Sequence, residues 1–553
     1  MGAQDFWRGR SRYTVFDSDY GDGSRFAALL ASWRADPQRP AHLHLLALAP
    51  DHGLQPGFHR IPQADAGVTL DLLAVPFATA LAELQAHLDF IQLHAHEGDA
   101  FIRPLARLTA LEARLFAPAL RPEQQSALTA QGFVFDGDHA VFSTRKPRLP
   151  ATPEPERRAL VLGAGVAGCA AAARLCARGW DVTLVERHAD VATEASGNLA
   201  GIFMPLLSRD DNIPTRLARS SYLYALRLWE QLGGIGRAFE GAQCGVLQLS
   251  RDAQHAAASR AIASDGRVPA DFARWLEPNE AEALLGLPAP DGGWLFPQGG
   301  WARPGSLCVA LLNACGARLT RRFGVGDVRF ERVGGEWQAL TANGDIVGQA
   351  PTVIVASGAG ARHMPQTADL PLQALRGQVT HLAPEFAPQL PLVLCREAYL
   401  TPSAQGVRCA GATYDLDDER FLRASSQEEN VARLRSLVSD PHAAEGAPLL
   451  GRVGFRCVAP DRLPLVGRLP DFAAAGATER LRDVPRHPGL HGLLGYASRG
   501  IIWAPLAAEL LAARLEGEPL PLEASLVDAL DPARFVLRAR RSSRVPAPLD
   551  IGP

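Results

Sequence analysis

The chain has 553 residues, 47% of them hydrophobic, and a formal net charge of −3. This length allows two to four domains of about 100–200 residues each, and the composition is that of a globular protein. The near-neutral charge excludes a basic field over the whole molecule, so nucleic-acid contact would have to come from a local patch.

Membrane and metal-binding classes are also disfavoured. The N-terminus has no apolar stretch typical of a signal peptide, and no run of about 18 uncharged apolar residues predicts a membrane span. The eight cysteines form no C-x-x-C pair and no Cys/His cluster with zinc spacing. We therefore expect a cytoplasmic protein with reduced thiols, no metal and no membrane contact. The oligomeric state is not indicated.

Residues 1–145 predict a small separate α/β domain. The apolar periodicity indicates helices at 26–33 and 106–116, strands at 42–49, 68–75 and 90–93, and a closing hairpin at 132–142. Four prolines between residues 145 and 157 indicate a semi-rigid connection, and we assign 146–157 as a linker.

A βαβ unit follows the linker. A strand at 159–162 leads into Gly163, Gly165 and Gly168, which satisfy G-x-G-x-x-G and open a helix. The helix start offers free N–H groups to a pyrophosphate. A second strand ends at Glu186, roughly 20 residues on, where a carboxylate binds the ribose hydroxyls and disfavours a 2′-phosphate. The pattern predicts a dinucleotide site; the alternative is a glycine-rich helix start that binds nothing.

A second strand-and-glycine element favours FAD over NAD. Residues 352–361 read TVIVASGAGA and include Gly358. In two-domain FAD oxidoreductases such a strand returns to the nucleotide domain beside the cofactor, whereas a simple NAD dehydrogenase has no need of it.

Six further motifs carry a specific resemblance. They read ASGNLAGIFMPLLSRDD (195–211), LFPQGGWARP (295–304), LRGQV (375–379), YLTP (399–402), GFRCVAPDRLPLVG (454–467) and GYASRG (495–500). Together they resemble the oxidoreductase half of the MnmC family of bacterial tRNA-modifying enzymes and, more broadly, the D-amino-acid-oxidase and glycine-oxidase superfamily.

The resemblance implies an α/β fold with a Rossmann-like FAD-binding domain and an inserted antiparallel-sheet substrate domain of the D-amino-acid-oxidase type. A small degenerate methyltransferase-like α/β domain would precede it, at 1–145. The oxidoreductase would span 158–530, with FAD-binding parts near 158–240, 299–375 and 451–530 and substrate parts near 241–298 and 376–450. A basic tail would follow at 531–553.

The resemblance also implies the reaction. Family members oxidise 5-carboxymethylaminomethyl-(2-thio)uridine at the tRNA wobble position, releasing glyoxylate and leaving 5-aminomethyl-(2-thio)uridine. A methyltransferase half then methylates the amine with S-adenosylmethionine (SAM). The cofactor performs the hydride chemistry, so we expect the protein chiefly to orient the substrate.

Two residues are expected to carry substrate recognition. Arg456 in GFRC matches the position that holds the substrate carboxylate in glycine-oxidase-like enzymes, a task for which a guanidinium fork is suited. A surface arginine paired with an acid is the alternative. Tyr399 would line the same pocket, or else pack as a strand aromatic in the core.

Three short segments are expected around the cofactor and substrate. Ser196, Gly197 and Asn198 resemble the loop under the flavin, with a plain turn as the alternative. Gly300 and Trp301 resemble the stretch between substrate and cofactor domains, although Trp301 could equally belong to the core. Ser498, Arg499 and Gly500 precede a helix at 501–515 whose start would face the flavin pyrimidine.

The N-terminal third departs from the family. Where the family has a loop of the type E-T-G-F-G-T-G-L-N-F, residues 17–26 read DSDYGDGSRF; Gly21 and Gly23 remain, and Asp19 replaces the first glycine. Asp19 would repel the methionine carboxylate of SAM. The family's acidic motif is also missing from 90–101, where His94 stands near the lost Asp. SAM binding is therefore doubtful, and we expect an inactive methyltransferase relic.

A tRNA substrate requires phosphate contacts. The candidates are a basic tail and the linker, unless these are merely solvated charges: Arg534, Arg538, Arg540, Arg541 and Arg544, with Arg145, Lys146 and Arg148.

Three alternatives remain open for the whole chain: a free glycine, sarcosine or D-amino-acid oxidase or dehydrogenase, a fully bifunctional enzyme, and a non-catalytic tRNA-binding protein that keeps FAD as a structural group.

Overall fold

The computed structural model describes residues 6–50, 52–65, 67–145, 153–476 and 478–543. The chain divides into two compact units. The N-terminal unit comprises 1–155, 226–228 and 509–527, and the second unit holds the remainder. Residues 509–527 thus belong to the N-terminal unit, whereas the sequence-based boundaries assigned them to the oxidoreductase.

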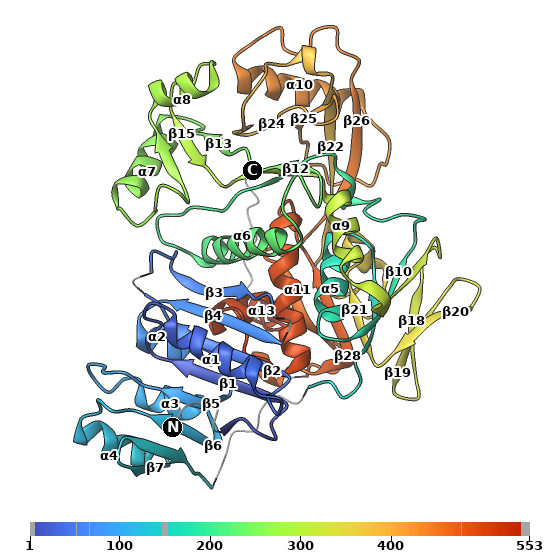
Figure 1. Cartoon of the computed structure of the whole chain (residues 1–553). Helices are drawn as coiled ribbons and strands as arrows, with labels where there is room; N and C mark the ends of the chain where they lie inside the picture. The colour runs from blue at the N-terminus through green and yellow to red at the C-terminus, as the bar shows by residue number, and fades with distance from the viewer. Residues whose placement is uncertain (1–5, 51, 66, 146–152, 477, 544–553) are drawn as a thin grey trace. The chain divides into compact units, whose positions relative to one another are not determined.

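An eight-stranded sheet forms the centre of the N-terminal unit (Figure 1). Its spatial order is β3-β4-β2-β1-β5-β6-β8-β7, and β4, β2, β1, β5 and β6 run parallel. The strands are β1 (Arg12–Asp17), β2 (His42–Leu48), β3 (Gly57–Pro62), β4 (Val68–Ala74), β5 (Leu88–Gln92), β6 (Thr109–Phe116), β7 (Phe133–Asp136) and β8 (His139–Phe142). The helices are α1 (Ser24–Ala35), α2 (Phe77–Glu83), α3 (Ile102–Leu108) and α4 (Pro122–Ala130).

The central strands of this sheet are buried on both faces. In β1, Val15 packs into one apolar cluster and Phe16 into the other, because successive side chains point to opposite faces. The strand order reverses between β1 and β5. A ligand crevice is therefore expected where these two strands end, after Asp17 and Gln92.

The predicted helix at 106–116 is wrong. The helix α3 ends at Leu108, and Thr109–Phe116 form β6, which pairs with β5 on one side and β8 on the other. Ala113 and Leu115 are buried while Glu112 and Arg114 are exposed, which is the alternation of a strand. Pairing on both edges overrides the helical propensity of this stretch.

The second unit contains a six-stranded sheet, ordered β17-β10-β9-β21-β28-β27 and parallel except for β27 at its edge. Its strands are β9 (Arg158–Leu162), β10 (Asp181–Glu186), β17 (Leu319–Phe323), β21 (Thr352–Val355), β27 (Leu465–Pro470) and β28 (Arg486–Leu494). The predicted return of Thr352–Val355 to the nucleotide sheet is confirmed, since β21 lies directly beside β9. The helices α5 (Val166–Cys176), α6 (Ile213–Gln231), α9 (Pro304–Asn313) and α11 (Gly500–Glu516) belong wholly or partly to this unit.

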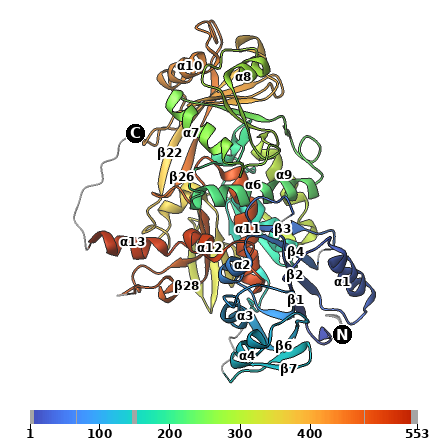
Figure 2. The same cartoon turned by 90° about the vertical axis from the view of Figure 1, so that its left-hand side faces the viewer.

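A mostly antiparallel sheet of eight strands forms the inserted substrate layer, in the order β14-β15-β13-β23-β24-β25-β22-β26. The strands are β13 (Val246–Leu249), β14 (Arg274–Leu276), β15 (Gly293–Phe296), β22 (Gln373–Leu382), β23 (Val393–Cys395), β24 (Tyr399–Leu400), β25 (Arg408–Gly411) and β26 (Leu450–Val458). Helix α10 (Ala424–Val438) packs on it (Figure 2), together with α7 (Ala253–Ser264) and α8 (Pro278–Leu285) at the far end. Because β26 pairs with β22 along its whole length, the substrate layer extends past residue 450, the expected boundary.

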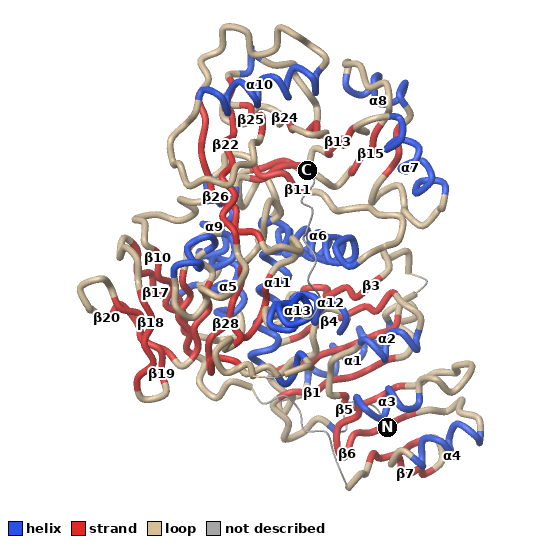
Figure 3. The backbone as a smooth tube through the Cα atoms, turned by 180° about the vertical axis from the view of Figure 1, so that it is seen from behind, coloured by secondary structure: helices blue, strands red, loops and turns tan. Residues whose placement is uncertain are grey.

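Two small sheets complete this unit (Figure 3). One joins β11 (Gly201–Phe203), β16 (Gly300–Ala302) and β12 (Gly241–Ala242), and the other joins β18 (Arg329–Val333), β19 (Glu336–Leu340) and β20 (Ile346–Ala350). The predicted fold class, a Rossmann-like flavin domain with an inserted sheet and a smaller N-terminal α/β part, is confirmed.

The expected basic tail begins inside the folded unit. After α12 (Ala524–Leu530), helix α13 (Arg534–Ser543) buries Arg534 against Asp461, with guanidinium–carboxylate distances of 2.9 and 3.0 Å. Arg538 pairs with the same Asp461. The prediction that Arg534 contacts a phosphate is therefore wrong. Lys146, Arg148 and Arg544 lie outside the described residues, as do the side chains of Arg540 and Arg541.

Within the described ranges, no helix is long and apolar enough to cross a membrane, and no group of three His, Cys, Asp or Glu side chains is placed to hold a metal. All eight cysteines are free thiols.

Candidate active site

The glycine loop after β9 leaves no room for side chains. Gly163 has φ +103°, and a Cβ there would lie 2.7 Å from the carbonyl oxygen of Ala356. At Gly168 a Cβ would lie 1.8 Å from the carbonyl oxygen of Gly163, so this glycine lets α5 pack against the loop. The geometry is that of a dinucleotide loop, in which the backbone itself approaches the ligand.

Glu186 closes the other side of this loop. One carboxylate oxygen accepts from the backbone N–H of Ala164 at 2.7 Å, and the other accepts from His188 N–H at 3.0 Å. The side chain is buried and lines the cavity that starts at the loop. A carboxylate with fixed orientation at the end of the second strand suits the hydroxyls of an adenosine ribose.

A single cavity of about 940 Å³ runs from the glycine loop to the substrate sheet. It brings together most of the residues predicted from sequence: Gly163, Gly165, Glu186, Ser196, Asn198, Gly358, Tyr399, Arg456, Ser498, Arg499 and Gly500. These residues are spread over more than three hundred positions of the sequence. They nevertheless line one cavity, which is large enough for a dinucleotide.

The cavity walls also fit FAD in their polar groups. The hydroxyls of Ser357 and Tyr496 are buried and have no hydrogen-bond partner among the described residues, and both residues line the cavity. Buried polar groups are rarely left unpaired, so these two are available to a polar ligand. The start of α11 at Gly500 adds the free N–H groups of a long helix.

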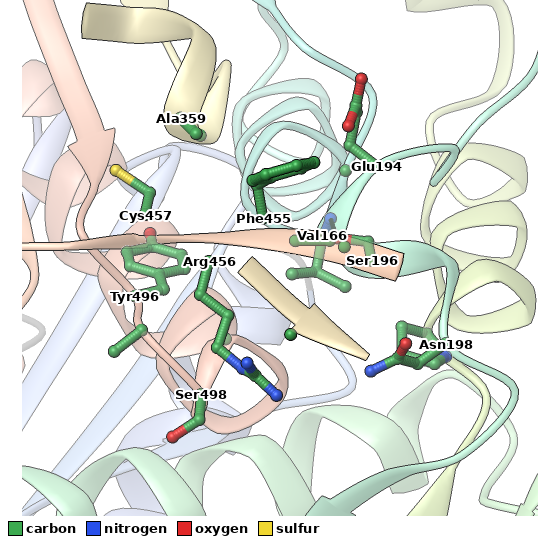
Figure 4. Close-up of a pocket in the computed structure, with 18 of the residues that line it drawn as sticks. Val166, Glu194, Ser196, Asn198, Ala359, Phe455, Arg456, Cys457, Tyr496 and Ser498 are labelled. Carbon is green, nitrogen blue, oxygen red and sulfur yellow. Dashed lines mark hydrogen bonds between the residues drawn. The ribbon is translucent and has the colours of Figure 1, made fainter. Parts of the chain in front are cut away.

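Arg456 is a cation of the cavity wall that comes from the substrate sheet. It projects from β26 opposite Leu375 of β22, and its guanidinium extends into the pocket (Figure 4). A Cβ at Gly377 would lie 2.0 Å from its Nη1, so the missing side chain of Gly377 makes room for the guanidinium. Nη1 donates to the carbonyl of Thr413 at 3.3 Å, and the ring of Tyr414 lies 4.5 Å from Cζ.

No carboxylate among the described residues pairs with Arg456 or with Arg499, which lies in the same cavity near Tyr414. The predicted alternative for Arg456, an arginine paired with an acid, is therefore absent from the described structure. Burial lowers the pKa of Arg499, because desolvation disfavours the charged form of the guanidinium. The two guanidinium groups make this end of the cavity attractive to anions.

Tyr399 sits on β24, and burial raises its pKa well above the ordinary value, with Cys409 adding to the effect and Arg456 opposing it. The phenol therefore stays protonated at neutral pH and can donate a hydrogen bond. Burial likewise raises the pKa of the neighbouring Cys395 thiol to about 12, so it remains neutral.

Four predicted residues lie outside the cavity wall. Gly168 packs behind the loop, and at Gly197 a Cβ would meet the guanidinium of Arg452. Gly300 and Trp301 lie in β16, where Trp301 is buried and pairs with Ile202 of β11. Their contribution is to the packing between elements.

Sequence reasoning missed Gly377 and Tyr414. Gly377 stands in the LRGQV motif, and a glycine inside an apolar strand is itself a signal that another group approaches closely. Tyr414 carried no such signal.

In the N-terminal unit, side chains at the ends of β1 and β5 bond one another. The loop after β1 has Asp17 accepting from Arg25 Nε at 2.8 Å, and the second Asp17 oxygen lies 3.1 Å from His94 Nε2. Arg25 also donates to the backbone carbonyl of Asp19. The backbone N–H of His94 donates to Ser18 Oγ at 2.8 Å, which ties the ends of β1 and β5 together.

Comparison with known proteins identifies the family. The model of the FAD dependent oxidoreductase family matches residues 158–514. The MnmC protein of Burkholderia thailandensis, described as a tRNA 5-methylaminomethyl-2-thiouridine biosynthesis bifunctional protein, is 40% identical over 98% of this chain and 92% of its own. The Burkholderia mallei protein of that name is 39% identical over 98% and 93%.

The chain belongs to the MnmC family and is a FAD-dependent oxidoreductase. Among solved structures, glycine oxidase from Geobacillus kaustophilus has a TM-score of 0.56 at 22% identity, covering 68% of this chain and 99% of its own. Iminodiacetate oxidase from Chelativorans sp. BNC1 has a TM-score of 0.55 at 24% identity, covering 66% and 96%. These likenesses confirm the flavoenzyme fold.

Proposed function

We propose that the protein oxidises the carboxymethylaminomethyl side chain of a modified tRNA wobble uridine, leaving an aminomethyl group and releasing glyoxylate. The observation that carries this proposal is the guanidinium of Arg456, which lines the cavity of an MnmC-family oxidoreductase and pairs with no carboxylate among the described residues. Such a substrate ends in a carboxylate, and a guanidinium fork binds that group with two parallel hydrogen bonds.

Each side chain has a task in this reaction. Arg456 binds the carboxylate and so fixes the carbon between carboxylate and amine, while Gly377 leaves room for the guanidinium. Tyr399 offers a protonated phenol to the same region. Bound FAD would supply the hydride acceptor for that carbon, so that water could hydrolyse the oxidised C–N bond to glyoxylate and the amine.

The cofactor would lie between the glycine loop and the start of α11. Gly163, Gly165 and Glu186 would hold the adenosine diphosphate part, and Ser196, Asn198, Gly358 and the hydroxyl of Ser357 the middle. Ser498, Arg499 and Gly500 would face the flavin ring, where positive charge favours its reduced form.

We also propose that the methyl-transfer activity of the family is lost here. Arg25, Asp17 and His94 form a closed network at the point where a parallel sheet of this order binds its ligand. Asp19 adds a carboxylate where the family has glycine, which would repel the carboxylate of SAM.

The test uses the purified flavoprotein without oxygen and tRNA that bears carboxymethylaminomethyluridine. We expect bleaching of the flavin, glyoxylate, and the aminomethyl nucleoside in digested RNA, with the same product when SAM is added. Bleaching by glycine or sarcosine but not by tRNA would refute the tRNA substrate. A methylaminomethyl product would refute the loss of methyl transfer.

A further inference from the structure

An exposed apolar segment borders the active-site cavity. Four large side chains in a stretch of nine residues face solvent: Tyr414, Leu416, Phe421 and Leu422 are 56%, 78%, 77% and 47% exposed. No other nine-residue stretch of the described chain carries more than one exposed large apolar side chain. Clusters of this kind on a folded protein mark interaction sites. We call residues 414–422 the rim segment.

The rim segment is firmly held from beneath. Arg376 is fully buried and donates to the backbone carbonyls of Glu419 at 2.8 Å and Phe421 at 2.7 Å. Its Nη1 also donates to the carboxylate of Asp415 at 3.2 Å. Because the backbone is fixed by a buried guanidinium, the outward position of Phe421 and Leu416 is a property of the fold rather than of a fraying loop.

The rim segment is continuous with the cavity. Tyr414, Asp418 and Arg420 line the cavity, and Tyr414 stacks on the Arg456 guanidinium at 4.5 Å. Arg420 lies over the ring of Phe455 at 5.5 Å. The rim segment therefore borders the part of the cavity in which Arg456 lies.

The paired carboxylates of the rim segment indicate which part of an RNA it could contact. Asp417 receives two hydrogen bonds from Arg423, at 2.6 and 2.8 Å, and Glu419 pairs with the same arginine. These carboxylates would repel a phosphate backbone that ran directly over the segment. Aromatic and aliphatic surface with few free cations suits the flat faces of unpaired nucleobases, which stack without regard to sequence.

We propose that the rim segment binds the unpaired bases on either side of the target uridine, with Phe421 as the main stacking platform and Leu416 beside it. This inference rests on the proposed tRNA substrate. It places the recognition of the RNA loop on the inserted substrate layer, next to the carboxylate site.

The experiment measures the binding of an anticodon stem-loop RNA to the FAD-bound protein and, separately, flavin reduction by that RNA and by the isolated modified nucleoside. Phe421→Ala should weaken RNA binding and raise the KM for the RNA about 10-fold, the range expected for one stacked base. Reduction by the isolated nucleoside should not change. Phe421→Tyr keeps an aromatic face and should restore both RNA values.

The matched control is Val333→Ala, at an exposed apolar residue of β18 in the same unit, which should alter none of these values. Unchanged RNA binding by Phe421→Ala, or equal losses in Phe421→Ala and Phe421→Tyr, would overturn the proposal. So would sedimentation showing a wild-type dimer that Phe421→Ala dissociates, because the segment would then be a contact between two copies. If the wild-type protein binds the RNA but does not oxidise it, the proposed function fails while the binding comparison still decides the rim segment.

Discussion

The two units offer a comparison between two loops of the same kind. In each unit a glycine-containing loop connects the first strand of a parallel sheet to the helix that follows. After β9, Gly163, Gly165 and Glu186 line an open cavity. After β1, Gly21 and Gly23 are present, and Arg25 Nε donates a hydrogen bond to the Asp17 carboxylate at 2.8 Å.

The difference teaches that the same kind of glycine loop can be combined with different side-chain contacts. Gly21 and Gly23 adopt φ values of +59° and +80°, so they serve the turn. What distinguishes the flavin cavity is that the hydroxyls of Ser357 and Tyr496 in its wall have no partner among the described residues, whereas Asp17 and Arg25 in the other loop bond each other. A ligand site requires groups that the fold leaves unpaired.

The largest effect is expected from Gly168→Ala. The new Cβ would fall 1.8 Å from a backbone oxygen, so the loop and α5 cannot keep their positions. We expect the protein to be purified without flavin and without activity, as judged by its absorption spectrum. Gly21→Ala is the matched change in the other loop and should leave flavin content unaltered; loss of flavin there would break the comparison.

Arg456→Ala should come next. Removing one partner of a desolvated charge pair costs about 2–5 kcal/mol, which corresponds to roughly a 30- to 5000-fold loss in kcat/KM. Flavin content should stay normal, because Arg456 comes from the substrate sheet. Rapid-mixing measurements of flavin reduction without oxygen report the loss, and normal turnover would show that the carboxylate binds elsewhere.

Asp71→Asn should affect the N-terminal unit alone. Arg60 is fully buried and bonds Asp71 at 2.8 and 2.9 Å and Glu509 at 2.9 Å. Breaking such a pair costs about 3–5 kcal/mol. We expect an early unfolding step in thermal melts, with flavin content and turnover retained. Parallel loss of flavin would contradict the independence of the two sites.

The stabilisation contributed by Asp71 should decrease at low pH. Burial would raise the pKa of Asp71, but the charge and hydrogen bonds of Arg60 outweigh it, so the pKa lies below the ordinary 3.8. The ionised carboxylate therefore stabilises the fold above about pH 3.8, and this contribution is lost as the pH falls further. The difference in free energy of unfolding between wild type and Asp71→Asn should shrink there in denaturant titrations.

The smallest effect is expected from the double change Asp19→Gly and Arg25→Asn, which reintroduces the family's loop residues. It removes the repelling carboxylate and opens the crevice. We expect calorimetry to detect SAM binding at least about 10-fold tighter than in wild type, the equivalent of one charge-assisted hydrogen bond. Tight SAM binding by the unchanged protein would show that the loop was never closed.

The sequence identifies many of the residues that line the cavity because its signals are local. Gly163, Gly165 and Glu186 follow from one βαβ pattern, and Tyr399 and Arg456 line the same cavity. The features that the sequence did not predict depend on contacts between segments that are distant in the chain. The strand at Thr109–Phe116 is made by its two neighbours, and Arg534 becomes a buried partner of Asp461 instead of a solvent-facing charge.

Helix α11 determines how the N-terminal unit could be produced as a separate polypeptide. Its first turn lines the cavity, but from Glu509 onward it belongs to the N-terminal unit, and Ser525 further along bonds Glu83 at 2.8 Å. A polypeptide ending at residue 155 would thus contain Arg60 without Glu509. A cut in the proline-rich linker would leave residues 509–527 on the C-terminal fragment. An N-terminal fragment that folds by itself would therefore have to include residues 509–527 as an added segment.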